Sequence, residues 1–405
     1  MWFFQTQGSV VVFHDRKVGS VAIHRIQEPP RKMKNQSHQP SKNHPFNAAA
    51  TISFVVLTAL LIFVPSSHAA TIVWNAASGS DLGTAANWTG GVLPSAATPD
   101  TAQWNNTPSG ALSLTYGLTT LGGAAGNAGI TLNMTALNTG SLSIDTGVNT
   151  SGIRIGNVTL ASGAGAFTLG NSANTFNITL GGAASTQTWQ NDSANTAMIN
   201  SDVVIGLGGG AAHTLALAGT GNWAFNNVLG NGGGTLTLTK AGVGTATLSG
   251  LNTYTGNTTV SGGNLNLTGS ASMTAGFFAN TGGKLSLSGT FGANAAGNIF
   301  IIGQTAGKGM LTIPAGVTLS RNNMFVGDNS AGDGAVYQTG GTLSLTQTSV
   351  DTLRIGSAGS GKGYYKISGG ALNVNEVGIG ASLADTGPRK CSNSSIISRN
   401  KSSQK

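Results

Sequence analysis

The 405-residue chain has 62 glycines, while only 8% of its residues are charged and 6% are aromatic. Intrinsic disorder caused by a high net charge and low hydrophobicity is therefore excluded. The frequent Gly, Asn, Thr and Ser after residue 70 predict an all-β fold, because glycine destabilises helix interiors. The formal net charge of +8 arises at the two ends of the chain, since residues 70–388 hold eight basic and ten acidic residues. A basic stripe on the folded part would indicate a nucleic-acid partner, and this charge balance argues against one.

An export signal is predicted over residues 33–69. Residues 1–32 match nothing downstream, so we expect a mis-annotated extension and a true start at Met33. An N-terminal segment that contains lysines is followed by an uncharged, apolar run, 48–64, and then by small residues that end at Ala69. These are the three parts of a secretory signal, so cleavage is expected after Ala69. The alternative is an uncleaved membrane anchor, because the run is near the lower length limit for spanning a bilayer.

Residues 70–125 are predicted to form a tryptophan-containing N-terminal cap. The segment holds Trp74, Trp88 and Trp104. A stack of β-coils exposes apolar core and unpaired strand edges at its end, so it needs an atypical terminal unit. The alternative is that these tryptophans stack on sugar rings.

Residues 126–387 are predicted to form short strands, in which apolar and polar residues alternate and which glycines separate. A regular repeat can be recognised after residue 300. Apolar–glycine pairs mark equivalent points at Ile302–Gly303, Val326–Gly327, Ile355–Gly356 and Ile379–Gly380. Self-similarity at this period is typical of a solenoid. We expect a right-handed parallel β-helix of roughly 13 turns, with about 24 residues in each turn. A β-sandwich or a propeller is the alternative.

Residues 388–405 break this pattern. They are basic and rich in serine, and they contain the single cysteine, Cys391. We expect a disordered tail produced by a frameshift or a premature end, which would make the chain a truncated fragment.

The segment 238–269, LTKAGVGTATLSGLNTYTGNTTVSGGNLNLTG, carries an ordered motif. It resembles the autotransporter-associated β-strand repeat, although Ala246 stands where that family usually has Leu. The matching positions include Lys240, Gly242, Gly244, Asn252, Tyr254, Gly256 and Gly263. The resemblance implies a passenger-like parallel β-helix of an exported protein, in which the tyrosine stacks in a turn of the repeat. It implies no particular reaction.

The sequence predicts no catalytic residues, no cofactor and no metal site. Asp328 and Asp333 could offer oxygens to calcium, but a solvated turn explains them as well. Hydrolysis of a glycosidic bond needs two carboxylates about 5–10 Å apart, and the residue expected beside Asp328 in the preceding turn is Gln304. His213 is expected at the surface, with no acid nearby in the sequence.

These observations predict a secreted or cell-surface, non-catalytic β-solenoid, an adhesive or structural module of a Gram-negative-type bacterium. The expected partner is a glycan or a cell-envelope surface. Membrane contact is expected only through the signal segment or a missing C-terminal anchor, and the oligomeric state is left open. The alternative is a polysaccharide-acting, pectin lyase-like β-helix enzyme, which would need a groove lined by two or more carboxylates.

Overall fold

The chain divides into two compact units, residues 1–64 and 65–405. A computed structural model describes residues 10–14, 21–25, 68–116, 127–146, 152–171, 174–182, 185–207, 210, 212–269, 277–279, 282–292, 299–304, 307–328, 332–347, 352–356 and 361–380. In the first unit, β1 (Val10–His14) pairs with β2 (Val21–Arg25) in an antiparallel ribbon. The apolar run 48–64 and the tail 388–405 lie outside the described residues, so the predicted signal and tail are untested.

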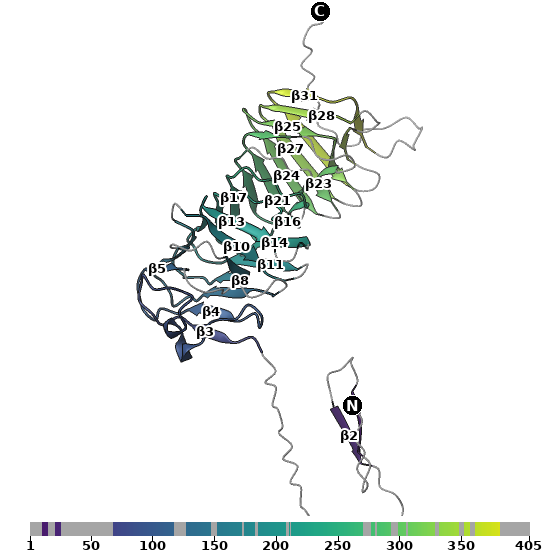
Figure 1. Ribbon diagram of the computed structural model, residues 1–405. Helices are drawn as coiled ribbons and strands as arrows, with labels where there is room; N and C mark the ends of the chain where they lie inside the picture. Colours follow the sequence, from purple (N-terminus) through teal and green to yellow (C-terminus); the bar gives the residue numbers. More distant parts are fainter. Residues whose placement is uncertain are drawn as a thin grey trace, which may run out of the picture. The chain divides into compact units, whose positions relative to one another are not determined.

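The second unit is a parallel β-solenoid, in which the chain returns to the same sheet once in every turn (Figure 1). Its first sheet follows one path through β3 (Thr71–Val73), β4 (Thr101–Trp104), β6 (Ile130–Met134), β8 (Ile153–Leu160), β11 (Thr186–Asn191), β14 (Ala212–Ala218), β16 (Thr235–Lys240), β18 (Thr258–Val260), β20 (Phe277–Ala279), β23 (Ile299–Gln304), β26 (Asn323–Asp328), β29 (Leu353–Ile355) and β32 (Val377–Ile379). Two further strands, β10 (Phe176–Leu180) and β13 (Val203–Leu207), lie off this path.

Two more sheets complete the solenoid. The second sheet stacks 11 strands, namely β5 (Leu112–Thr115), β7 (Leu142–Asp145), β9 (Phe167–Leu169), β12 (Ala197–Ile199), β15 (Trp223–Phe225), β17 (Thr245–Leu248), β19 (Asn264–Leu267), β21 (Gly283–Leu287), β24 (Lys308–Ile313), β27 (Asp333–Gln338) and β30 (Lys362–Ile367). The third has β22 (Thr290–Phe291), β25 (Thr318–Arg321), β28 (Thr342–Leu345) and β31 (Ala371–Asn373).

The all-β prediction is confirmed. Helical structure in the described residues is limited to two short 3₁₀ helices, η1 (Ala85–Asn87) and η2 (Thr89–Gly91), and to Gly210. None of the helices in this part of the chain is long and apolar enough to span a membrane. The path of the first sheet contains 13 strands, and the second sheet contains 11. The strands β10 and β13 are additional to that path.

The register of the last turns matches the periodicity in the sequence. Ile302 pairs with Val326, Val326 with Ile355, and Ile355 with Ile379. The glycine that follows each apolar residue has a positive φ, between 71° and 88°, a conformation that side chains with a Cβ rarely adopt. In these four turns the repeated glycine therefore lies at an equivalent point, either next to last in its first-sheet strand or directly after it.

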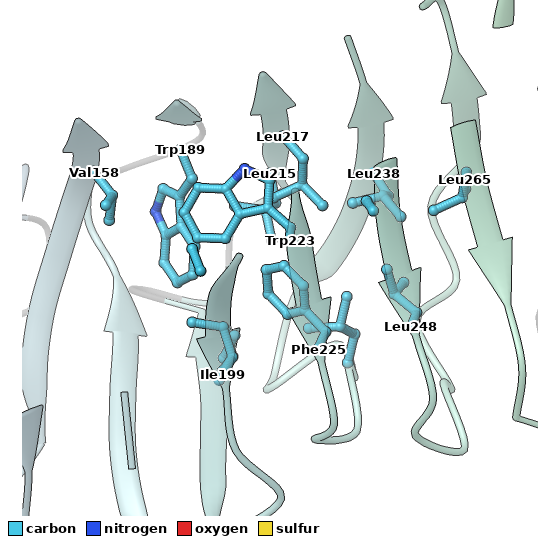
Figure 2. Close-up of a cluster of buried hydrophobic side chains, with 14 of the residues drawn as sticks. Val158, Trp189, Ile199, Leu215, Leu217, Trp223, Phe225, Leu238, Leu248 and Leu265 are labelled. Atoms are coloured by element: carbon cyan, nitrogen blue, oxygen red, sulfur yellow. The ribbon is translucent and has the colours of Figure 1, made fainter. Parts of the chain in front are cut away.

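Alternation along each strand separates the core from the surface. In β16, Leu236 and Leu238 are buried, whereas the threonines between them face outward. Figure 2 shows such inward residues from several turns packed together, among them Trp189, Trp223 and Phe225. The ring centroids of the two tryptophans are 5.9 Å apart, and those of Trp223 and Phe225 are 6.0 Å apart. Burial of large apolar side chains stabilises the stack, by about 1.5–3 kcal/mol each.

The three N-terminal tryptophans form one buried cluster. The rings of Trp74 and Trp88 meet edge to face at 5.0 Å, and those of Trp88 and Trp104 at 5.8 Å. Each side chain is at most 2% exposed. Sugar stacking on these rings is therefore ruled out in this conformation, because no ring face is open. β3 and β4 belong to the first sheet, and the predicted boundary at residue 125 lies outside the described residues.

Candidate functional site

The lysine of the repeat motif, Lys240, points into the solenoid and is 1% exposed. Its Nζ donates hydrogen bonds to the carbonyl oxygens of Ala241 at 2.7 Å, Gly242 at 3.1 Å and Gly262 at 3.3 Å. An ammonium group has three N–H donors, so these carbonyls use its full capacity. Burial lowers the pKa of Lys240 to about 8. The side chain holds two successive turns together.

Asn252 and Tyr254 are also buried, at the opposite bend of the motif. The Asn252 amide nitrogen donates to the carbonyl of Gly250 at 2.9 Å, and its oxygen accepts from the backbone N–H of Leu229, one turn away, at 3.0 Å. The Tyr254 hydroxyl lies 2.6 Å from the Thr258 hydroxyl, and burial raises the pKa of Tyr254 above its usual value. These contacts connect adjacent turns and fix the bend.

The glycines of the motif lie where successive turns approach most closely. A Cβ atom placed on any of them would overlap a backbone carbonyl of the preceding turn, at Gly242, Gly244, Gly256 and Gly263. All seven motif residues therefore take part in stacking the turns, and their positions suggest a structural role. A binding or catalytic role for them is not indicated by this geometry.

The prediction that His213 lies at the surface is wrong. Its side chain is 1% exposed. In β14 it faces the same side as the buried Leu215 and Leu217, and it pairs in register with the buried Leu236. The alternation that places the leucines in the core places the histidine there too, and this pattern was visible in the sequence.

Several carboxylates of the solenoid hold loops through hydrogen bonds. Asp100, which is 5% exposed, accepts hydrogen bonds from the backbone N–H groups of Ala70 and Ser95 and from the Thr98 hydroxyl, at 2.8 to 2.9 Å. Asp192 accepts from the backbone N–H of Thr220 at 3.0 Å. In the part of the chain that the structure describes, His, Cys, Asp and Glu side chains do not gather in threes around a possible metal position.

The two carboxylates considered for calcium lie on different sheets. Asp328 ends β26 and pairs in register with Gln304, as predicted. It forms an ion pair with Arg354, with 2.6 Å between its Oδ1 and the arginine Nη2, and it is 5% exposed. The guanidinium also lies over the ring of Phe325, 3.9 Å from its centroid. Asp333 begins β27 in the second sheet. Because Asp328 is buried and paired with Arg354, it is part of a salt bridge and not of a solvated turn.

Comparison with known proteins gives one informative similarity. No family model matches the chain, and no solved structure matches it significantly. The chain is 28% identical over 200 residues to the "Adhesin BmaC autotransporter" of Brucella suis biovar 1 (strain 1330). It resembles part of an autotransporter adhesin. The aligned region covers 47% of this chain and 6% of the adhesin, so the chain spans a small fraction of its relative's length.

Sequence reasoning missed the salt bridge and a second buried cation. Arg354 lies one turn from Asp328, in the neighbouring strand β29. Arg321, 1% exposed, donates from Nη1 to the carbonyls of Gly292 and Ser320, and burial lowers its pKa to about 10. The alternation in β25, where Leu319 and Arg321 face the same side, was the available signal.

Proposed function

We propose that this chain is a non-catalytic, passenger-like adhesive module that acts outside the cell or on its surface. The observation that carries the proposal is the similarity to an autotransporter adhesin, found in a chain whose described body is a parallel β-solenoid. A stack of turns offers a long outer surface on which contacts can repeat. A Gram-negative bacterium is the source that the relative suggests.

Export and capping belong to the same proposal. Residues 33–69 act as the secretory signal, and the segment 70–125 closes the first turn of the solenoid. The buried tryptophan cluster supports the second role, because it fills the interior beside β3, the first strand of the stack. The repeat in 238–269 is assigned to the autotransporter-associated family on its motif residues, whose buried and inter-turn positions agree with a stacking role.

The proposal is tested by displaying the full chain on a non-adherent bacterium and counting bacteria attached to cultured epithelial cells. Attachment several-fold above the undisplayed strain is expected, and attachment should disappear after protease treatment of intact bacteria. Equal attachment with and without the chain would contradict an adhesive role. Depolymerisation of polygalacturonate by the purified chain would instead favour a polysaccharide-acting enzyme.

A further inference from the structure

The outer face of the second sheet changes its chemistry at its C-terminal end. One outward column passes in register through Thr247, Asn266, Ser286 and Thr312. In the next two turns the same column continues as Tyr337 and then Lys366. We call the outward side chains of β21, β24, β27 and β30 the lysine–tyrosine face. These strands are neighbours in the second sheet, and Figure 1 labels the first three of them.

The exposed lysines of the solenoid are concentrated on this face. All eight basic residues of 70–380 lie in the described ranges. Arg154, Lys240 and Arg321 are buried, and Arg354 is paired with Asp328. The remaining four are exposed and lie on this one face, at Lys284, Lys308, Lys362 and Lys366.

One acidic residue interrupts the lysines. Asp333 of β27 stands in register between Lys308 of β24 and Lys362 of β30. Because neighbouring strands are about 4.8 Å apart, these two lysines are separated by roughly 10 Å. The face thus carries cations that are spaced along the stack and not packed into one dense cluster.

Two tyrosines lie among these lysines. Tyr337 and Tyr364 are half-buried on the outside of the sheet, with ring centroids 5.6 Å apart and planes tilted by 51°. The other tyrosines of the solenoid, Tyr116, Tyr254 and Tyr365, are buried in its interior. Aromatic rings at a surface combine an apolar face with a polar edge, which suits contact with a ring of a sugar.

We propose that the lysine–tyrosine face binds an acidic polysaccharide, that is, a glycan with carboxylate or sulfate groups. The spaced lysines pair with its charges, and the tyrosines pack against its sugar rings. Spaced cations interrupted by Asp333 fit a polymer with separated charges better than a nucleic acid, which carries one charge per 1.7 Å of duplex. This inference rests on the proposed adhesive function and names the class of ligand.

The test uses the purified full chain, with immobilised heparin and hyaluronan as probes and dextran as a neutral control. The triple variant Lys308→Gln, Lys362→Gln, Lys366→Gln should bind at least tenfold more weakly. The double variant Tyr337→Thr, Tyr364→Thr should also weaken binding, by about fivefold. At position 337 the new threonine matches Thr312, which lies in register one turn earlier. Wild-type binding to dextran should be absent. Circular dichroism verifies that each variant retains its β-structure.

A charge-relocation variant separates the face from net charge. It combines the triple substitution with Thr214→Lys, Thr237→Lys and Thr239→Lys on the outside of the first sheet, where threonines face outward. This variant should remain as weak as the triple variant. Recovery of wild-type affinity would overturn the proposal, and so would absence of binding to both acidic probes.

Two further outcomes would refute this ligand or this face without refuting the adhesive function. If displayed chain attaches to cells but the triple variant attaches equally well, the lysine–tyrosine face is refuted and adhesion itself stands. Tighter binding to single-stranded DNA than to heparin at the same ionic strength would refute the acidic glycan as the ligand.

Discussion

Substitution of Gly327 by alanine should destabilise the C-terminal turns of the solenoid. Gly327 has a φ of 72°, which costs an alanine about 1–2 kcal/mol. The new Cβ would also lie 2.8 Å from the backbone nitrogen of Gly363 and nearer still to the carbonyl of Lys362. Relief of that overlap requires the backbone to move, at a cost typical of overpacked cores, about 1–3 kcal/mol. The expected total is about 2–5 kcal/mol.

Gly316→Ala is the matched control. Gly316 also has a positive φ, 81°, but nothing lies within 4 Å of its Cβ position. The Gly316→Ala variant should therefore be destabilised only by the unfavourable φ, by about 1–2 kcal/mol. The comparison isolates the contribution of the close approach between turns.

Hydrogen exchange measured by mass spectrometry is the appropriate assay, because it reports local opening free energies in a stack that need not unfold as one unit. Peptides from β26, β29 and β30 should exchange faster in Gly327→Ala than in Gly316→Ala, while peptides from β6 and β8 stay unchanged in both. Equal protection of β26, β29 and β30 in the two variants would refute the reasoning from inter-turn contact.

Three other predictions follow from buried groups. Trp223→Ala should lower the free energy of unfolding by about 3–5 kcal/mol, measured by urea denaturation; a loss below 1 kcal/mol would contradict its central place in the core. Because burial lowers the pKa of Lys240 to about 8, the folded state binds fewer protons than the unfolded state above that pH. The stability of the wild type relative to Lys240→Met should therefore rise by about 2 kcal/mol from pH 8 to pH 10, and a flat difference would argue against the buried ammonium. Asp328→Ala should destabilise β26 and β29 by about 1–2 kcal/mol, less than for a fully buried pair, since the Arg354 side chain is 21% exposed; unchanged exchange in β29 would contradict this.

The sequence predicted the parts of the fold that repeat. Alternation gave the inward and outward faces, and the apolar–glycine pairs predicted the register of Ile302, Val326 and Ile355. It did not predict the third sheet or the extra strands β10 and β13, because these depend on where each turn bends. It also missed the salt bridge of Asp328 and Arg354 and the gathering of four lysines on one face. Such contacts join residues in different turns, and they become visible only when the register is known.

Binding of the purified, folded full chain to intact epithelial cells tests the central claim most directly. Labelled chain would be titrated onto the cells and measured by flow cytometry, with urea-unfolded chain as the control. The account predicts saturable binding that unlabelled folded chain displaces and that unfolded chain does not reproduce. Binding that never saturates, or that is the same for folded and unfolded chain, would contradict an adhesive surface formed by the solenoid.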